Sequence, residues 1–232
     1  MSERTKNLIK GIVGIFVYFF FNFATYDILK LIGIDGSKLS DAQVVLVSTI
    51  FSLIIVIFLI LISRKKFIQN IKDFLKNNIS YFKRNAKYWL WSLAIMFVSN
   101  LFISLIFNTI TSANDQAVRT LFDSFPIYIF FSAVIIAPFT EELVFRQSIR
   151  YLIKNDYLFI IVSGLIFGFM HVLASLSSVA DILYLIPYSV PGFAFAYMLT
   201  KEDNVMVPIS FHLIHNGLSM ALMIIGKLVG VM

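Results

Sequence analysis

The sequence predicts an all-α protein that crosses a membrane several times. Its mean hydropathy is +0.87, 59% of its 232 residues are hydrophobic, and only 14% are charged. Soluble domains carry about 25% charged residues, so this deficit is typical of a chain solvated by lipid. About seven apolar runs are long enough for transmembrane helices, which need ~20 residues each. Together these observations predict one polytopic integral membrane helical bundle.

Short polar segments set the limits of the apolar runs. The predicted spans cover residues 8–33, 43–63, 88–110, 126–152, 157–177, 181–200 and 205–230. The first is longer than the apolar part of a signal peptide, and no small-residue cleavage site follows it, so we expect it to be retained. Four prolines lie within or at the edges of the later runs: Pro138, Pro187, Pro191 and Pro208. They predict broken helices around a polar site in the membrane.

Positive charge is concentrated on one side of this seven-span arrangement. It precedes the first span, fills residues 64–87, follows the fourth span and recurs between the last two. The positive-inside rule makes this side cytoplasmic, which predicts a cytoplasmic N-terminus in a plasma membrane. Because topology accounts for the charge, nucleic acid is not expected as a partner. The abundance of Phe, Ile, Asn and Lys suggests an A+T-rich genome, as in low-GC bacteria.

The segment 64–87 combines lysines with apolar residues at helical spacing. Phe67, Ile71, Phe74 and Leu75 repeat every three or four residues. This pattern predicts an amphipathic helix lying on anionic lipid in a cytoplasmic loop. An electropositive dock for a substrate or partner is the alternative.

The stretch APFTEELVFR places Glu141 and Glu142 inside the fourth run. On insertion scales one acidic side chain at a helix centre costs about 2.5–3.5 kcal/mol, so such residues are usually functional. Glu142 and Arg146 are four residues apart and share a helix face, so Arg146 can neutralise Glu142 and leave Glu141 available. The alternative is that both glutamates pair with Arg146 and Arg150 near the cytoplasmic surface.

Pro138 lies just before this pair. Since proline disrupts a helix interior, we expect the helix to break there. Thr140 would then cap a new helix whose first turn carries the glutamates.

All three histidines follow the glutamate pair, and each falls within a predicted span. His171 ends FGFMH, four residues after Phe167, so the phenyl ring can pack on the imidazole. His212 and Asn216 are also four residues apart, whereas His215 is expected to lie outside the immediate site. Counted from the cytoplasmic ends of their spans, His171 is about 10 Å deeper than His212. Tilted or broken helices would have to bring them level.

These residue types suit hydrolysis in a membrane cavity. A carboxylate can act as general base toward water, a histidine can hold that water, and an imidazole and an amide can stabilise an oxyanion. Zn²⁺ held by Glu and His is another way to activate water. The spacing of the glutamates and histidines does not fit the zinc-binding motif HExxH. The sequence also lacks GxSxG, the motif that carries a serine nucleophile in α/β-hydrolases. The chain has no cysteine, which excludes a thiol nucleophile, disulfides and thiolate metal sites.

Three short motifs occur in order in successive predicted spans: EELVFR (141–146), FGFMH (167–171) and HLIHN (212–216). In this respect the sequence resembles the CAAX-processing and bacteriocin-processing intramembrane proteases, the CPBP or Abi family, and in particular the type II CAAX prenyl endopeptidases. The resemblance covers roughly residues 120–230. It implies peptide-bond hydrolysis inside the membrane, in a cavity open to the cytoplasm.

The resemblance also implies roles for individual residues. The catalytic residues would be Glu141, His171, His212 and Asn216. The supporting residues would be Glu142, Arg146 and Phe167. Glu141 and His171 would activate water, and His212 and Asn216 would stabilise the oxyanion. This scheme requires no cofactor; if Zn²⁺ is bound, Glu141, His171 and His212 would hold it.

The expected organisation has two regions. Residues 1–115 would form the N-terminal transmembrane helices with the basic cytoplasmic loop, and residues 116–232 the catalytic membrane domain. Besides membrane lipid, the expected partner is a peptide or protein, lipidated or membrane-inserted, in CAAX-type, bacteriocin or peptide-pheromone processing. Two alternatives stay open. One is a non-catalytic bacteriocin-immunity or membrane binding protein of the same fold, and the other is a transport or proton-relay protein.

Overall fold

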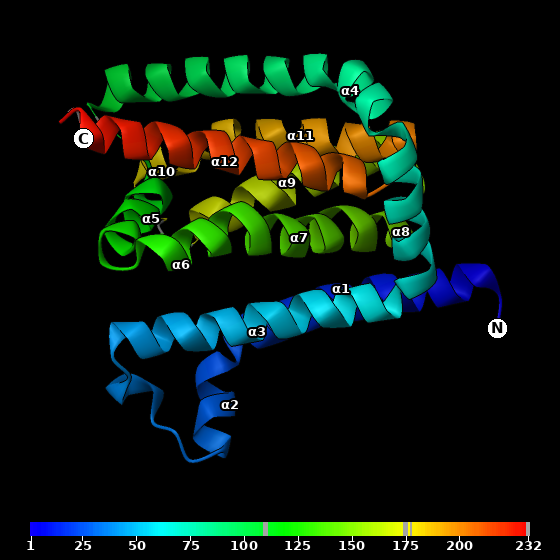
Figure 1. Ribbon diagram of the computed structural model, residues 1–232, viewed down its shortest axis with the longest axis horizontal. Helices are drawn as coiled ribbons and strands as arrows, with labels where there is room; N and C mark the ends of the chain where they lie inside the picture. Colours follow the sequence, from blue (N-terminus) through cyan, green and yellow to red (C-terminus); the bar gives the residue numbers. More distant parts are fainter. Residues whose placement is uncertain (109–110, 174–175, 177, 231–232) are drawn as a thin grey trace.

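The computed structural model describes residues 1–108, 111–173, 176 and 178–230, and this part of the chain contains helices and turns but no strand (Figure 1). Within the described residues, six helical segments are long and apolar enough to cross a membrane. They are α1 (Glu3–Phe23), α3 (Asp41–Ile62), α4 (Arg64–Phe107), Pro126–Leu152, Val179–Glu202 and α12 (Met206–Leu228). The predicted all-α polytopic bundle is therefore confirmed, and the chain is an integral membrane protein.

The remaining predicted span, 157–177, corresponds to a shorter apolar helix, α9 (Asp156–Val172). Its 17 residues span about 25 Å, somewhat less than the ~30 Å of a bilayer core. The helix begins where the Asn155 side chain accepts a hydrogen bond from the Leu158 amide at 2.9 Å. The ends of two predicted spans, at residues 109–110 and at 174, 175 and 177, lie outside the described residues.

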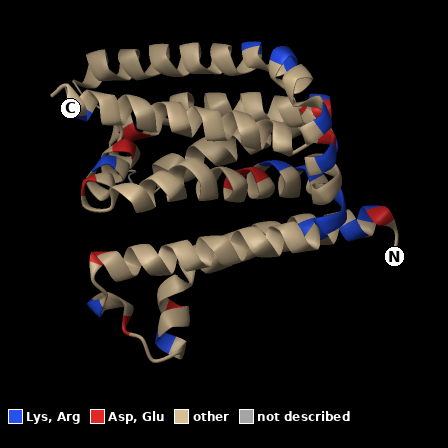
Figure 2. Cartoon of the chain, viewed as in Figure 1, with Lys and Arg blue, Asp and Glu red and all other residues tan. Residues whose placement is uncertain are grey.

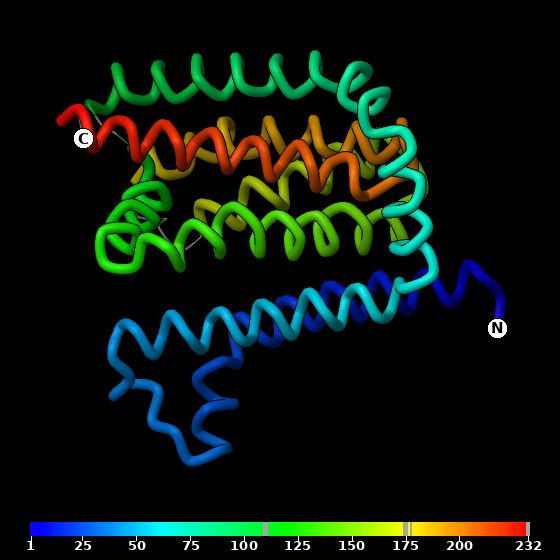
Figure 3. The backbone as a smooth tube through the Cα atoms, in the orientation of Figure 1, coloured from blue at the N-terminus to red at the C-terminus, as the bar shows by residue number. Residues whose placement is uncertain are grey.

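The spans run side by side, and the two ends of the chain lie at opposite ends of the bundle (Figure 3). α1 and α3 pack on the segment Pro126–Leu152, and α4 covers the other side next to α12 (Figure 1). α9 and α11 (Leu185–Glu202) make the most extensive helix pair in the bundle. α9 carries the FGFMH motif, and α11 also contacts α4 and α12.

Glycines allow α9 and α11 to approach closely. A Cβ atom at Gly168 would lie 2.1 Å from Ser189 Oγ and 3.0 Å from the Leu185 carbonyl oxygen. A Cβ at Gly192 would lie 3.0 Å from the Gly164 backbone. Small residues at crossings of this kind let membrane helices gain van der Waals contact in place of a hydrophobic driving force.

The basic segment 64–87 is the first part of α4, a continuous helix of 44 residues. α4 bends so that this part crosses the ends of the spans, while the second part runs alongside α12 (Figures 1 and 3). Lys and Arg positions are concentrated along it and at the neighbouring helix ends (Figure 2). The predicted helix is present, but it continues directly into the third span.

Polar contacts anchor the basic segment on the turn between α11 and α12. The Asn204 amide donates to the Asn70 carbonyl at 2.9 Å and to the Asp73 carboxylate at 2.8 Å. Arg84 pairs with Glu202 at 2.8 Å. These contacts connect residues more than a hundred positions apart, so a helical pattern in sequence cannot reveal them.

The expected helix break at Pro138 is wrong, and so is the expected capping role of Thr140. Residues from Pro126 to Leu152 form one helical run: α6 (Pro126–Phe131), a π-helix (Ser132–Ile136), α7 (Ala137–Glu141), a second π-helix (Glu142–Ser148) and α8 (Ile149–Leu152). The widened π-turn before Pro138 accommodates the prolyl ring and its missing N–H without ending the helix. Thr140 instead donates to the Ile136 carbonyl at 2.9 Å.

Two further elements were not expected from the sequence. The first predicted span ends early, at Phe23, and a short helix, α2 (Thr25–Leu31), turns away from α1 (Figure 1). The linker before the fourth span contains α5 (Ala113–Ser124), a helix at the end of the bundle far from the basic segment (Figures 1 and 2). A short helix, α10 (Val179–Leu183), precedes α11 at this end.

Candidate active site

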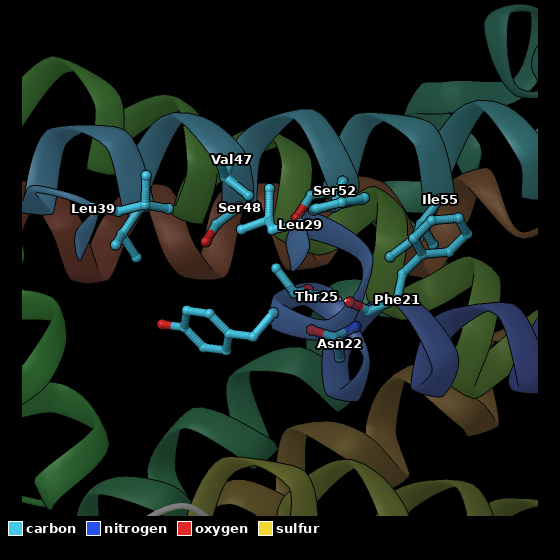
Figure 4. Close-up of a pocket in the computed structure, with 12 residues that line it drawn as sticks. Phe21, Asn22, Thr25, Leu29, Leu39, Val47, Ser48, Ser52 and Ile55 are labelled. Carbon is cyan, nitrogen blue, oxygen red and sulfur yellow. Dashed lines mark hydrogen bonds between the residues drawn. The ribbon is translucent and has the colours of Figure 1, made fainter. Parts of the chain in front are cut away.

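A cavity of about 370 Å³ lies between α4, α5, the run Pro126–Leu152, α9, α11 and α12. All four residues with expected catalytic roles line it: Glu141, His171, His212 and Asn216. A smaller cavity, of about 180 Å³, lies between α1, α2 and α3 (Figure 4). Residues such as Phe21, Thr25 and Ser48 line it, and none of the expected site residues does so. The structure therefore brings the three motifs together in the larger cavity.

Glu142 and Arg146 form an ion pair behind the cavity wall. Arg146 Nε lies 3.1 Å from Glu142 Oε2, and both side chains are fully buried. The predicted pairing is therefore present. Arg150 pairs instead with Asp156 at 2.6 Å, which argues against the alternative in which it neutralises the glutamates.

Further contacts hold the Arg146 guanidinium in place. Arg146 donates to Ser163 Oγ at 3.3 Å, and Ser163 donates to the Phe145 carbonyl at 2.6 Å. The guanidinium carbon lies 4.6 Å from the centre of the Phe167 ring, a cation–π contact. Burial makes an uncompensated charge costly, so these partners matter more here than they would at a surface.

His212 lies between the two glutamates. Its Nδ1 atom is 2.9 Å from Glu142 Oε1, and its Nε2 atom is 3.8 Å from Glu141 Oε2. A carboxylate oxygen accepts, so Nδ1 carries a proton and Nε2 faces Glu141. At 3.8 Å the latter pair is too far apart for a direct hydrogen bond, and a bridging water would fit the spacing.

Charge balance limits the protonation of this cluster. Glu142 and Arg146 compensate each other, so the cluster is neutral only if Glu141 and His212 hold one exchangeable proton between them. If Glu141 holds the proton, both side chains are neutral. If His212 holds it, a Glu141 carboxylate faces an imidazolium, and the net charge is again zero.

The Phe167 ring lies between the two histidines of the site. Its centre is 4.5 Å from that of His171 and 5.6 Å from that of His212. The Phe195 ring stacks on the other side of His212 at 5.1 Å. The two imidazoles thus contact the same aromatic ring. Although their positions in sequence predict different depths in the membrane, both histidines line one cavity.

His171 is held by contacts on both sides of its ring. Its Nδ1 atom lies 2.8 Å from the Phe167 carbonyl oxygen, which can only accept, so Nδ1 carries the proton. The Nε2 atom of the neutral ring is then an acceptor. The ring stacks on Tyr188 with centres 4.9 Å apart.

Tyr188 connects His171 to the start of α5. Its hydroxyl lies 2.5 Å from Ser112 Oγ and donates to Asp115 Oδ1 at 3.1 Å. Ser112 is also the N-cap of α5, accepting from the Asp115 amide at 3.1 Å. Sequence analysis missed Tyr188 and Asp115, because no helical spacing relates residues 73 positions apart.

Asn216 and His215 both line the cavity. Asn216 donates to the Ala133 carbonyl in the first π-helix at 2.8 Å, which leaves its second amide hydrogen for another acceptor. His215 lies against the Phe195 ring, with centres 6.3 Å apart, and its Nδ1 atom is buried without a hydrogen-bond partner. His215 thus lies in the cavity wall, and its expected place outside the immediate site stays a prediction.

The candidate zinc ligands do not form a metal-binding arrangement. Across the described residues, no group of three or more His, Cys, Asp or Glu side chains is placed to hold a metal ion. Glu141 faces His212, whereas the His171 ring contacts Phe167 and Tyr188. The donor set Glu141, His171 and His212 thus does not fit Zn²⁺ in this conformation.

Comparisons with known proteins match the part of the chain that carries the motifs. Residues 123–218 match the family model described as type II CAAX prenyl endopeptidase, Rce1-like. A Bacillus subtilis protein named "Putative membrane peptidase YdiL" is 32% identical over 108 residues, which cover 45% of this chain and 41% of that protein. An uncharacterized protein of Mycoplasma capricolum is 35% identical over 92 residues, 39% of this chain and 26% of that protein.

The chain thus spans about two fifths and one quarter of the lengths of these two relatives. No solved structure gives a significant match. The matched residues contain the glutamate pair, all three histidines and Asn216. In residues 123–218, the chain is similar to the Rce1-like type II CAAX prenyl endopeptidases.

Proposed function

We propose that this chain is an intramembrane endopeptidase that hydrolyses a peptide bond with activated water. The observation that carries the proposal is the position of His212, whose two nitrogens face Glu142 and Glu141 at 2.9 and 3.8 Å in one cavity. The match of residues 123–218 to the family model of type II CAAX prenyl endopeptidases supports the same activity. A membrane protein that only packed its helices would have little reason to bury two adjacent carboxylates and an imidazole together.

The first step is removal of a proton from water. In the form with an ionised Glu141 and a protonated His212, the Glu141 carboxylate accepts a proton from a water molecule in the cavity. His171 Nε2, which is an acceptor in the neutral ring, receives a hydrogen bond from the same water and orients it. The oxygen of that water adds to the carbonyl carbon of the substrate.

The second step is stabilisation of the oxyanion and cleavage of the C–N bond. His212 Nε2–H and the second N–H of Asn216 donate to the oxyanion. Glu141, now protonated, gives its proton to the leaving nitrogen as the C–N bond breaks, which releases an amine and a carboxylic acid. Glu142 and Arg146 do not touch the substrate; Glu142 orients His212, and Arg146 neutralises Glu142.

The organisation expected from the sequence is part of this proposal. Residues 116–232 would supply the catalytic groups, and residues 1–115 the flanking helices with the basic segment on the cytoplasmic face. The substrate would be a peptide or protein, lipidated or held in the membrane. The candidate substrates are CAAX-type proteins, bacteriocin precursors and peptide-pheromone precursors.

Cleavage of peptides by the purified protein in lipid vesicles tests the activity. A mixed library of plain and prenylated peptides would be incubated with wild type and with Glu141→Gln, and the products identified by mass spectrometry. The proposal predicts paired products from wild type alone. A folded wild type that binds peptides but leaves all of them intact would favour the non-catalytic binding protein.

A further inference from the structure

The turn between α11 and α12, residues 203–205, connects two helices that meet at the candidate active site. α11 carries Phe195 and α12 carries His212, and the two rings stack with centres 5.1 Å apart. His212 follows Met206, the first residue of α12, by six positions, which is about 9 Å along the helix axis. The position of the imidazole therefore depends on how this turn and the start of α12 are held.

Asn204 connects the start of α12 to the basic segment of α4. Its side chain is 1% exposed, and its Oδ1 atom accepts a hydrogen bond from the Met206 amide at 2.9 Å. Its Nδ2 atom donates to the Asn70 carbonyl at 2.9 Å and to the Asp73 carboxylate at 2.8 Å. One buried amide thus fixes the first residue of α12 against two residues of another helix.

Asn70 completes the hydrogen bonding at this helix end. Its Oδ1 atom accepts from the Val205 amide at 3.4 Å. The Val207 amide donates to the Asn204 carbonyl at 3.1 Å, and Pro208 has no N–H group to satisfy. The first N–H groups of a helix have no partner within the helix. Those of α12 therefore depend on Asn204 and on Asn70 of α4.

Aromatic contacts from α4 reach the residue beside His212. The Phe211 ring packs against Phe82 and Trp89, with centres 5.1 and 6.1 Å apart. Phe211 is 2% exposed and directly precedes His212. These contacts limit rotation of α12 about its axis, whereas the hydrogen bonds at the turn limit its sliding along the axis.

We infer that the part of α4 from Asn70 to Trp89 positions His212 by holding the α11–α12 turn and the first turns of α12. The effect on catalysis rests on the proposed protease function. Asn204 is the central positioning residue, and it acts through α12 rather than in the cavity. The segment 70–89 lies outside residues 123–218, so the N-terminal part of the chain would contribute to the site without supplying a catalytic group.

The contacts of His212 leave little room for movement of α12. Its Nδ1 atom lies 2.9 Å from Glu142, and N–H···O bonds are rarely longer than about 3.2 Å. A slip of α12 by one residue would move the imidazole by about 1.5 Å and turn it by about 100°. Loosening the turn should therefore remove His212 from the two glutamates in many molecules. The rate of the chemical step should fall more than the affinity for peptide.

Asn204→Ala tests this positioning role, with Asn77→Ala as the matched control. Asn77 donates to the same Asp73 carboxylate at 2.8 Å from an exposed position, so its loss leaves the turn contacts in place. For Asn204→Ala we expect kcat to fall about 10- to 100-fold while KM changes less than about twofold. Asn77→Ala should match wild type. Equal kcat values for the two variants would overturn the inference.

Nuclear magnetic resonance of ¹⁵N-histidine-labelled protein in lipid gives a readout that does not depend on cleavage. The chain has three histidines, so replacing each in turn assigns its signals. The inference predicts that Asn204→Ala changes the Nδ1 signal of His212. The signal of His171 should stay unchanged, because its Nδ1 atom bonds to the Phe167 carbonyl within α9. An unchanged His212 signal would overturn the inference, and so would equal changes in all three histidines, which would indicate a general loss of structure.

Two substitutions at Asn70 separate the hydrogen bond from the rest of the packing. Asn70→Ala removes the acceptor for the Val205 amide. Asn70→Asp keeps an acceptor at a helix N-terminus, where negative charge is favourable. We expect Asn70→Asp to retain the wild-type His212 signal and kcat, and Asn70→Ala to lose both. Equal losses in the two variants would overturn the role of this contact. If wild type cleaves no peptide, the histidine signals still test the positioning role, and only the protease function fails.

Discussion

The Nδ1 atom of His212 lies 2.9 Å from Oε1 of Glu142, although 70 residues separate them in the sequence. This contact leaves the other imidazole nitrogen directed at Glu141. Of two adjacent glutamates, one therefore orients the histidine while the other faces the cavity. The division of roles depends on Arg146, which neutralises the first glutamate in a fully buried position.

Replacing Glu142 with glutamine should destabilise the protein. The substitution leaves the Arg146 guanidinium buried without its counter-charge, and removing one partner of a buried pair typically costs about 3–5 kcal/mol. We expect a lower unfolding temperature and a smaller monodisperse fraction in detergent. Glu3→Gln is the matched control, since Glu3 pairs with Lys6 at an exposed site and its loss should change neither quantity. Equal behaviour of the two variants would refute the structural role of the pair.

A methyl group at Gly168 should separate α9 from α11. The added Cβ would lie 2.8 Å from the Ser189 backbone nitrogen, and overpacking of this kind usually costs about 1–3 kcal/mol. We therefore expect Gly168→Ala to unfold at a lower temperature than wild type. At Gly217 the nearest atom to a new Cβ is 3.7 Å away, so Gly217→Ala should match wild type. A Gly168→Ala protein as stable as Gly217→Ala would show that the two helices do not pack this tightly.

Tyr188 should position His171 through its ring, which stacks on the imidazole, and through its hydroxyl, which fixes the ring by contacts with Ser112 and Asp115. Tyr188→Phe removes the hydroxyl that contacts Ser112 and Asp115 but keeps the ring stacked on the imidazole. One hydrogen bond is worth ~1 kcal/mol, so we expect a several-fold loss of kcat/KM. Tyr188→Ala also removes the ring and should lower kcat further. If the two variants lose the same activity, the stacking contact has no part in positioning His171.

A strong chelator should leave peptide cleavage unchanged. The described site holds no group of three metal-ligating side chains, and the proposed steps use Glu141 and His171 to activate water. The measurement is the initial rate before and after chelation, followed by addition of Zn²⁺. Activity that is lost on chelation and restored by Zn²⁺ would require a rearranged site with Glu141, His171 and His212 as ligands.

The motifs were sufficient to predict which residues meet. Helical spacing alone placed Glu142 beside Arg146 and Phe167 beside His171, because both pairs are local. The contact between His212 and Glu142 was not predicted, because 70 residues separate them. Local spacing could not show which glutamate His212 would bind.

Other features depend on tertiary contacts and could not be predicted. Pro138 predicts a helix break, but the preceding π-helix, Ser132–Ile136, accommodates the proline within a continuous helical run. Contacts between distant residues hold α5 and the basic segment of α4 against the bundle, such as Ser112 with Tyr188 and Asn70 with Asn204. His215 adjoins Asn216 in sequence, and its position in the cavity wall follows from how α12 packs on Phe195.

The rate of peptide cleavage by Glu141→Gln, in the same lipid and with the same peptide as wild type, tests the central claim most directly. Glutamine keeps the shape of the side chain and cannot accept a proton from water. Loss of a general base typically lowers a rate by about 10²–10⁴-fold, and we predict a loss in this range with an unchanged unfolding temperature. A folded Glu141→Gln protein that cleaves at the wild-type rate would contradict the account, because water would then be activated elsewhere.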